Sequence, residues 1–436
     1  MHPRRSEGRV SKTISSRIIG KLVRPVVQAL FFSFFTILFF RISYPLADDV
    51  AKNLFFNIDP LILFGLALSG SGILAGLLLS AATVVATAVF GRVFCGWICP
   101  MGTIFDWSAR GFSETPRKPP YGKGRFTGLK YYILSFFAAG SIFGLTIVLF
   151  LDPLVFLLRV FTLTVHPSLV FLENGVLNML RGPLSDMGLM GLATRSHPQP
   201  AFAFALFNLI LFIAAIGLIR VEKRFWCRNI CPLGALLSVI SRFSLRKRMV
   251  NDACISCGKC AKTCPMNAID DGYRDTSSRE CIQCERCATV CPVEAISFGF
   301  GSPLNGFREH SPSRRGMIAA AGTGLLTAFA AGASTTRHTV HGKRLRPPGA
   351  KVEEDFLDAC LRCGACMKAC PTHGLQPAIT SAGFEGFFTP VLTPRIGGCE
   401  EKCNDCGRVC PTGAIRNLPL EEKQYAVIGN ATIEKN

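Results

Sequence analysis

The sequence predicts an α-helical membrane domain of four spans, a fifth apolar helix, and two small α+β domains built around cysteines. Three observations favour this class. Hydrophobic residues make up 49% of the 436-residue chain, which is high for a protein dissolved wholly in water. They gather in long uncharged runs, and the 20 cysteines fall in short regular groups. Cysteines grouped in this way favour metal binding over scattered disulfides.

Four apolar stretches are long enough for membrane helices, because a bilayer core needs about 20 apolar residues in helical form. They cover residues 25–40, 61–90, 131–151 and 201–219. Lys and Arg are frequent before the first stretch and after the second and fourth, and scarce after the first and third. This alternation predicts a cytoplasmic N-terminus, with residues 41–60 and 152–200 facing outward. The net charge is +19, and the basic residues flank the apolar runs, which favours anionic lipid as a partner over nucleic acid.

A fifth apolar stretch follows an arginine pair. Arg314 and Arg315 precede residues 317–334, an uncharged run rich in Ala and Gly. This pattern is typical of a twin-arginine export signal, so we expect the segment behind it to lie in the periplasm. The alternative is a flexible linker that stays in the cytoplasm. Cleavage after Ala333, in a sequence that resembles a signal-peptidase site, would release the last hundred residues.

The strongest motif is a doubled cysteine group ending in proline. The groups begin at Cys254 and Cys281, 27 residues apart, with the spacing of bacterial two-cluster ferredoxins. In that spacing three cysteines bind one [4Fe-4S] cluster, and the fourth, before the proline, binds the other. The predicted first set is Cys254, Cys257, Cys260 and Cys291, and the second is Cys281, Cys284, Cys287 and Cys264. A zinc ribbon would leave several of these cysteines unexplained.

A second doubled group lies near the C-terminus and predicts two further clusters. The third set is Cys360, Cys363, Cys366 and Cys410, and the fourth is Cys399, Cys403, Cys406 and Cys370. The gap between Cys399 and Cys403 holds three residues where the other groups have two. This departure leaves the ligands in place but puts the geometry of the fourth cluster in doubt.

The remaining four cysteines form two copies of an aromatic-Cys-x3-Cys-Pro motif. One copy follows the second predicted span and the other follows the fourth, so all four thiols are expected at the cytoplasmic face. The spacing of four places each pair on one side of a helical turn. They are candidates for an additional redox or metal site, which leaves open a cluster, a copper site or a thiol pair: Cys95, Cys99, Cys227 and Cys231. The alternative is free buried thiols in a duplicated helical hairpin.

The predicted domains are a basic tail (1–24), a membrane domain (25–250), a ferredoxin domain (251–300), the signal-like helix with its linker (301–350) and a second ferredoxin domain (351–436). None of the seven histidines lies in a predicted span, which argues against a haem crossing the bilayer. We find no dinucleotide fingerprint, no Walker loop and no catalytic acid, base or nucleophile. The sequence therefore favours an electron-transfer subunit over a stand-alone enzyme.

Residues 20–300, with their two CxxxCP motifs and the following two-cluster unit, resemble NapH and MauN membrane proteins. The remainder, from the arginine pair through Pro411, resembles the exported ferredoxin-type proteins NapG and MauM. The resemblance implies a fusion of the two, in the bacterial inner membrane, that takes electrons from the quinol pool and delivers them to a periplasmic redox enzyme or cytochrome. The alternative is a more distant resemblance to NosR and CcoG, which implies reduction or assembly of a copper or other metalloenzyme.

Overall fold

The computed structural model describes residues 19–46, 53–68, 78–111, 126, 128–142, 146–194, 196–301, 312–333, 344–379, 382–383 and 385–429. Most of the predicted basic tail and much of the linker around the signal-like helix lie outside the described residues. The chain divides into two compact units, and each is described by itself. The first comprises Met1–Leu38, Leu54–Leu154 and Ala214–Ala328, and the second comprises Phe39–Asn53, Val155–Ile213 and Phe329–Asn436.

The first unit contains a set of apolar helices. They are α2 (Arg24–Arg41, which runs on into the second unit) after the π-helical turn η1 (Ile19–Val23), α3 (Leu54–Asn57), α4 (Pro60–Leu68), α5 (Leu79–Phe90), α6 (Pro100–Gly111), α7 (Leu129–Ser141), η4 (Thr146–Leu151), η6 (Leu218–Arg220) and α12 (Pro232–Ser241). The sequence of α4, PLILFGLAL, is apolar all round, as expected for a helix buried on every side. Its start is fixed by Asp59, whose carboxylate accepts a 2.8 Å hydrogen bond from the Leu61 N–H, followed by proline at the first helical position.

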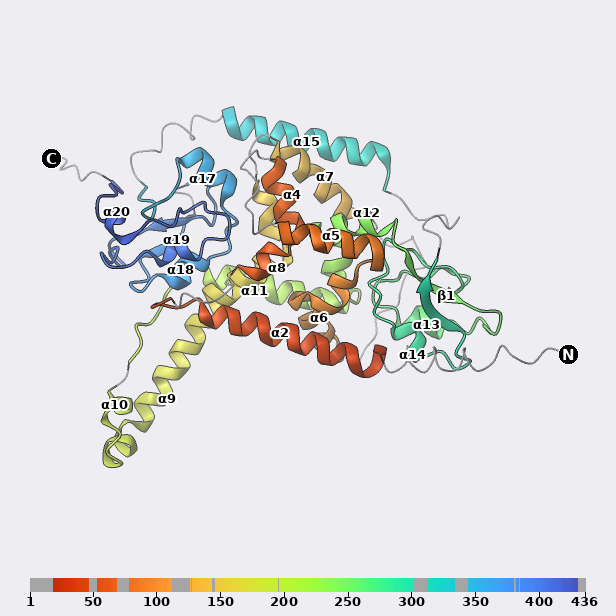
Figure 1. Cartoon of the computed structure of the whole chain (residues 1–436), viewed down its shortest axis with the longest axis horizontal. Helices are drawn as coiled ribbons and strands as arrows, with labels where there is room; N and C mark the ends of the chain where they lie inside the picture. Colours follow the sequence, from red (N-terminus) through yellow and green to blue (C-terminus); the bar gives the residue numbers. More distant parts are fainter. Residues whose placement is uncertain are drawn as a thin grey trace. The chain divides into compact units, whose positions relative to one another are not determined.

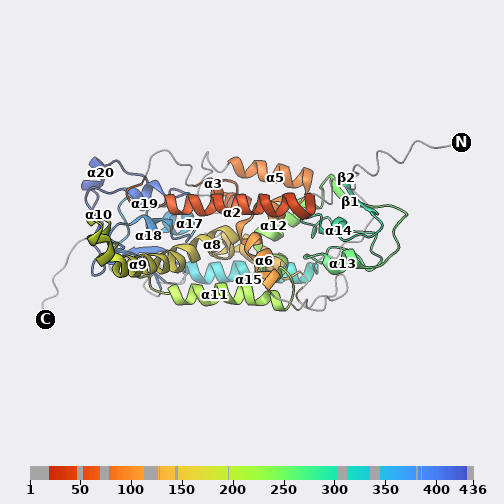
Figure 2. The same cartoon turned by 90° about the horizontal axis from the view of Figure 1, so that it is seen from below.

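The first cysteine-rich domain also belongs to this unit. Strands β1 (Arg246–Val250) and β2 (Ile296–Phe300) pair antiparallel, with Arg246 opposite Phe300, and flank the short helices α13 (Lys259–Thr263) and α14 (Arg286–Thr289) (Figure 2). The four elements enclose a small apolar core to which the cysteines themselves contribute.

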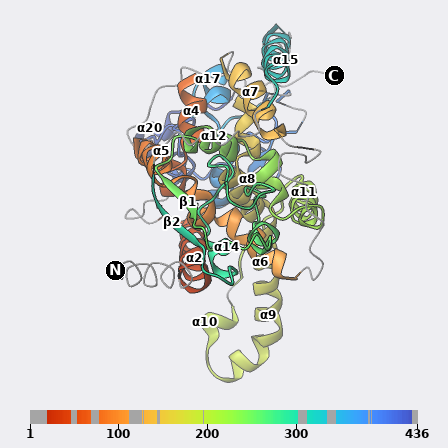
Figure 3. The ribbon, with the colours of Figure 1, turned by 90° about the vertical axis from the view of Figure 1, so that its right-hand side faces the viewer.

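The signal-like segment forms α15 (Arg314–Ala333), and its residues up to Ala328 belong to the first unit. It lies beside α7 (Figure 3), where the Ser135 hydroxyl donates to the Met317 carbonyl. A Cβ placed on Gly324 would be 2.1 Å from the Phe136 carbonyl oxygen. The two helices therefore approach closely through a small residue, as membrane helices do. Arg314 and Arg315 start α15 and are exposed.

The second unit holds the C-terminal cysteine-rich domain, drawn in blue in Figure 1. It consists of α17 (Glu353–Ala359), α18 (Ala365–Ala369), β3 (Leu375–Pro377), β4 (Pro390–Leu392), α19 (Asp405–Arg408) and α20 (Leu420–Gln424), with β3 and β4 antiparallel. The same unit includes most of α8 (Pro153–Val160), η5 (Phe161–Val165), α9 (His166–Asp186), α10 (Met190–Ala193) and most of α11 (Ala205–Gly217).

The C-terminal domain is attached to neighbouring segments of its own unit. The Leu46 N–H donates to the Asp405 carboxylate at 3.2 Å, and the Gln376 amide donates to the Ala201 carbonyl at 3.0 Å. Lys368 donates to the Ile42 carbonyl, and burial lowers the pKa of its ammonium to about 7. These contacts fix the domain against residues 42–46 and 201–203.

The prediction of four continuous membrane spans is not met in the described residues. Two helices there are long and apolar enough to cross a membrane, Lys21–Arg41 and Pro153–Asp186. The first corresponds to the first predicted span. The described residues of the second and third predicted spans contain the shorter elements α4, α5, α7 and η4, and the fourth span is the shorter apolar helix Ala205–Arg220.

Residues 152–200, predicted to face outward, contain the 34-residue helix Pro153–Asp186. Its segments α8, η5 and α9 follow one another directly, and Pro167 lies in the first turn of α9, where proline is tolerated. His166 is the first residue of α9.

Candidate metal centres

The cysteine loops of the first ferredoxin domain share one backbone pattern. Ser256 and Gly258 flank the second cysteine of the first group with φ of 52° and 69°, and Gln283 and Glu285 flank the equivalent cysteine with 52° and 56°. A left-handed conformation costs about 1–3 kcal/mol at a residue other than glycine. Where residues in this conformation alternate with residues of negative φ, successive N–H groups point toward one spot. They then form a concave anion-binding site of the kind found around iron–sulfur clusters.

The second predicted set surrounds one cavity of about 350 Å³. Its wall includes Cys264, Cys281, Cys284 and Cys287 together with apolar side chains such as Met266, Ile269 and Ile282. Cys264 belongs to the first cysteine group and the other three belong to the second, so cysteines of both groups line this one cavity. The Ala268 N–H points at the Cys264 sulfur from 3.4 Å.

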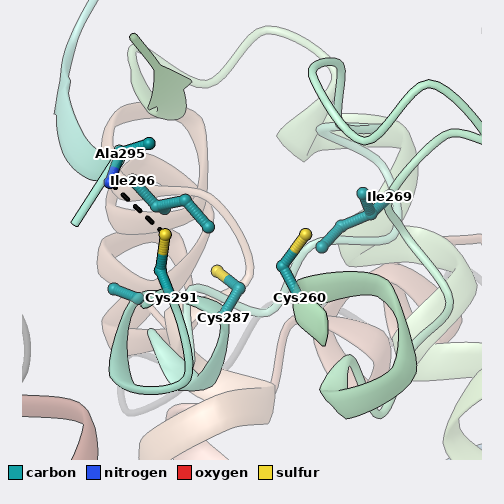
Figure 4. Packing of buried hydrophobic residues seen from close by; sticks show 7 residues of the cluster. Cys260, Ile269, Cys287, Cys291, Ala295 and Ile296 are labelled. Atoms are coloured by element: carbon teal, nitrogen blue, oxygen red, sulfur yellow. Dashed lines mark hydrogen bonds between the residues drawn. The ribbon is translucent and has the colours of Figure 1, made fainter. Parts of the chain in front are cut away.

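Three members of the first predicted set lie at the small core of the same domain. Cys260 and Cys291 are buried in this core (Figure 4), Cys254 packs against it, and Cys257 is exposed. Burial raises the pKa of the Cys260 thiol, and the neighbouring Cys254 and Cys257 add to this effect against the opposing charge of Arg248. The Ala295 N–H points at the Cys291 sulfur from 3.3 Å, which repeats the contact at Cys264.

The third and fourth predicted sets each surround a cavity of about 360 Å³ in the second unit. One cavity is lined by Cys360, Cys363, Cys366 and Cys410, and the other by Cys370, Cys399, Cys403 and Cys406. The loop of the third set repeats the left-handed pattern, with φ of 59° at Arg362 and 82° at Gly364. Residues 399–406, which are all described, contain no positive φ. The extra residue between Cys399 and Cys403 therefore changes the local backbone while all four cysteines still face the cavity.

The two CxxxCP motifs adopt the same local structure. Each begins with a π-helical turn, η3 (Phe94–Ile98) or η7 (Trp226–Ile230), and the second cysteine ends this turn with an extended ψ of 116° or 113°. The following proline starts α6 or α12. All four cysteines of the motifs are buried: Cys95, Cys99, Cys227 and Cys231. The duplication seen in the sequence is therefore a duplication in the structure.

Two buried arginines, each just before one motif, contact the helix that follows the other motif. Arg224, three residues before Cys227, donates to the Cys95 carbonyl at 2.8 Å and the Gly102 carbonyl at 3.0 Å. Arg92, three residues before Cys95, has its guanidinium 3.0 Å from a Cβ built on Gly234 and 4.0 Å from the Cys95 sulfur. Each arginine thus reaches the helix start of the opposite copy, which brings the two cysteine pairs to one site.

The four thiols influence one another. Burial raises the pKa of Cys99 and of Cys231 well above its ordinary value, and in both cases the charges of Cys227 and Cys95 raise it further. Burial also raises the pKa of Cys227 to about 11, although Arg224 opposes the shift. Such thiols keep their protons at neutral pH until a metal replaces them. The two arginines then supply the positive charge that an anionic thiolate site requires.

The first motif touches the loop of the second cluster set directly. The Trp97 indole N–H donates to the Gln283 carbonyl at 3.0 Å, and a Cβ on Gly96 would be 2.2 Å from the Ile282 carbonyl oxygen. Ile282 and Gln283 lie between Cys281 and Cys284. The charge of Cys284 also acts on Arg224. The CxxxCP site and the second cluster set are therefore in backbone contact.

A buried ion cluster holds this contact together. Asp106 of α6, 2% exposed, pairs with Arg24, with Arg224 at 2.8 Å and with Arg286 of α14 at 3.4 Å. Burial raises the pKa of this carboxyl, but the three guanidinium groups outweigh it and hold the pKa far below its usual range. The cluster connects helices α2 and α6 to the ferredoxin domain.

Within the described residues, no three His, Cys, Asp or Glu side chains lie close enough to hold a single metal ion. The second, third and fourth cysteine sets are spread around cavities instead, as ligands of separate irons in one cluster are. The positions of Arg92 and Arg224 at the two motifs were not predicted from the sequence. The signal was present, because Arg, the two cysteines and a later glycine recur at the same spacing in both motifs.

Family models match each of these regions. A "4Fe-4S binding domain" matches residues 73–119 and 204–251, which hold the two CxxxCP motifs. A "4Fe-4S dicluster domain" matches residues 253–295, and another "4Fe-4S binding domain" matches residues 355–376. These matches and the geometry of the sites indicate ferredoxin-type 4Fe-4S domains in both units.

Relatives with known names define the type more closely. The chain is 46% identical to the methylamine utilization ferredoxin-type protein MauM of Paracoccus denitrificans over 19% of its own length and 38% of MauM. It is 38% identical to the ferredoxin-type protein NapG of Escherichia coli over 30% of its length and 55% of NapG. Identity to the E. coli protein YccM, named for electron transport, is 30% over 44% of this chain and 46% of YccM.

Parts of the chain are thus similar to the ferredoxin-type proteins NapG and MauM. It spans about half the length of the relatives it matches, or less. No solved structure matches the chain.

Proposed function

We propose that this chain is a membrane-bound iron–sulfur protein that takes electrons from the quinol pool and passes them to a periplasmic reductase or another redox partner. The observation that carries the proposal is the continuity of cysteine sites in the first unit. The CxxxCP site touches the loop of the second set, and that set shares a small domain with the first. Electron transfer through a protein requires a series of redox centres that lie next to one another.

The four cysteine sets named above are the proposed ligands of four [4Fe-4S] clusters. The three cavities and the repeated N–H contacts to sulfur support this assignment. Bound at these cysteines, a [4Fe-4S] cluster supplies reversible one-electron transfer. The protein's part is to exclude water with apolar side chains and to aim N–H groups at the sulfurs, which tunes the reduction potential.

We place a fifth [4Fe-4S] cluster at Cys95, Cys99, Cys227 and Cys231. The family model that matches both motifs is a cluster-binding one, and the four thiols are buried and mutually close. A cluster with four thiolates is anionic, and burying it requires nearby positive charge. Arg92 and Arg224 lie beside the thiols and supply that charge.

We place the two ferredoxin domains on opposite sides of the bacterial inner membrane, with the N-terminus and the first domain in the cytoplasm. The first domain contacts residues 96–97, and the second contacts residues 42–46 and 201–203. The charge pattern puts the former inside and the latter outside. The exposed Arg314 and Arg315 at the start of α15 support export of the second domain. Replacing both with lysine should leave that domain protected from protease added outside spheroplasts, whereas the wild-type domain is digested.

A second candidate function is delivery of electrons to copper, or assembly of a copper enzyme. Buried cysteine thiols are soft ligands of the kind that Cu(I) prefers, which favours this alternative. Tight copper binding that is lost in a variant without these four cysteines, together with no response to quinol, would establish it in place of the first proposal.

The test of the main proposal is anaerobic reduction of the detergent-purified protein by a menaquinol analogue, followed by EPR. We expect quinol to reduce clusters, and an iron content of about 20 per chain for five clusters or about 16 for four. Reduction by dithionite but not by quinol would contradict the proposal, because the electrons would then enter from another donor.

A further inference from the structure

Two aspartates of the first unit each begin a helix in the same way. Asp59 precedes Pro60 and Leu61 at the start of α4, and Asp152 precedes Pro153 and Leu154 at the start of α8. In each case one carboxylate oxygen accepts the N–H two residues further on, at 2.8 Å. This is ordinary helix capping, and it uses one oxygen of each side chain.

Capping does not explain where the two side chains lie. Both residues are 0% exposed, and the two carboxyl groups are within hydrogen-bonding reach of each other. Capping is normally done at a surface, where water solvates the second oxygen. Here the second oxygen of Asp59 is buried and accepts no hydrogen bond from any group in the described part of the chain. A proton held between the two carboxyl groups would satisfy it.

The surrounding elements offer little charge to neutralise a pair of carboxylates. Helix α4 packs against α5, α7, α12 and η4, and of these only α7 carries a Lys, Arg, Asp, Glu or Tyr side chain in its described residues. On α7, Lys130 and Tyr131 bind Glu280 at 2.7 and 3.2 Å. Tyr132 hydrogen-bonds to Ser313. On α8, Arg159 donates to Asn208.

The charge of Asp152 also acts through space on the Cys231 thiol. Two carboxyl groups in contact at a fully buried position cannot both be ionised, because burial penalises each charge and the like charges repel. The pair therefore holds at least one proton, and it titrates as a unit.

We propose that Asp59 and Asp152 form a proton-binding site of the membrane domain, which accepts a proton from quinol as quinol is oxidised. The inference rests on the proposed function for the identity of the proton donor. Oxidation of one quinol to quinone releases two electrons and two protons. The electrons pass singly to the iron–sulfur centres, which are the oxidant. One proton enters the pair, which changes from one shared proton and a charge of −1 to two protons and no charge, and the other proton goes to water.

The site has a direct test that needs no quinol. Infrared spectra of the purified protein at neutral pH should show the C=O band of a protonated carboxylic acid that shifts in D₂O. The band should be missing in Asp59→Asn and in Asp152→Asn. Asparagine is also a good helix cap, so both variants are expected to fold. Asp252→Asn, at a fully exposed position, is the matched control and should keep the band. A wild type without the band, or a band that survives both variants, would overturn the site.

A second measurement tests its role. Quinol-driven reduction of the clusters should be about 100-fold slower in Asp59→Asn, as expected when a proton acceptor is lost, and less dependent on pH. Reduction by dithionite should be unchanged, which shows that the clusters are intact. Wild-type rates in both asparagine variants would overturn the role of the pair. If quinol fails to reduce even the wild type while the band is present, the proposed quinol function fails and the proton site stands without its donor.

Discussion

Gly96 is the position where a single methyl group most directly tests the contact between the CxxxCP site and the second cluster set. In Gly96→Ala the new Cβ would start 2.2 Å from the Ile282 carbonyl oxygen. The loop and the motif must separate by about 0.8 Å to reach even 3.0 Å, the shortest spacing that real Cβ atoms tolerate. The neighbouring 3.0 Å hydrogen bond from Trp97 to Gln283 would stretch with them. Overpacking of this kind costs about 1–3 kcal/mol.

The assay is loss of cluster iron to a chelator at fixed temperature. If the chelator reaches iron through local opening of this contact, a cost of about 1–3 kcal/mol increases the open population, and hence the rate, by about 5- to 150-fold. The EPR signal of the second cluster should change while those of the C-terminal domain do not. Gly111→Ala is the matched control, because a Cβ there meets nothing within 4 Å. Equal rates in the two variants would refute the contact.

Further predictions concern the elements that hold the first unit together. Asp106→Asn leaves the buried guanidinium groups of Arg24 and Arg224 and the partly buried one of Arg286 without their carboxylate, and it should destabilise the unit by about 3–5 kcal/mol. The loss should be seen as earlier loss of cluster absorbance on heating, whereas Asp252→Asn should have no effect. Because the pKa of Asp106 is depressed in the folded chain, its contribution should be complete above about pH 4 and be lost only as the pH falls further, so the difference between wild type and Asp106→Asn should shrink in acid. Gly324→Leu should separate α15 from α7 and speed its proteolysis in detergent, whereas Gly322→Leu, on an open face of the same helix, should not.

The cysteine framework could be predicted from the sequence because its rule is local. Three cysteines at fixed spacing form one loop, and the proline after the fourth ends it, so the crossing of Cys264 into the second set follows from spacing alone. The sequence even indicated where the pattern would change, at the longer gap before Cys403. The left-handed residues that shape each loop, such as Glu285, carry no such signal, since non-glycine residues adopt that conformation only under tertiary constraint.

The membrane helices were predicted less well, since hydropathy records how apolar a segment is and not where its helix ends. The run over residues 61–90 is apolar throughout, yet it holds two described helices that end at Leu68 and begin at Leu79. Contacts between residues that are far apart in the sequence could not be predicted either. Arg224 is 122 residues from Gly102, and Asp59 meets Asp152 only because two similar helix starts face each other.

The central claim is that electrons from quinol enter the ferredoxin domains through the CxxxCP site. The measurement that tests it most directly is quinol reduction of a variant in which Cys95, Cys99, Cys227 and Cys231 are all serine. The account predicts about four fewer irons per chain, clusters of the ferredoxin domains that dithionite still reduces, and loss of their reduction by quinol. Reduction by quinol at the wild-type rate in this variant would contradict the claim.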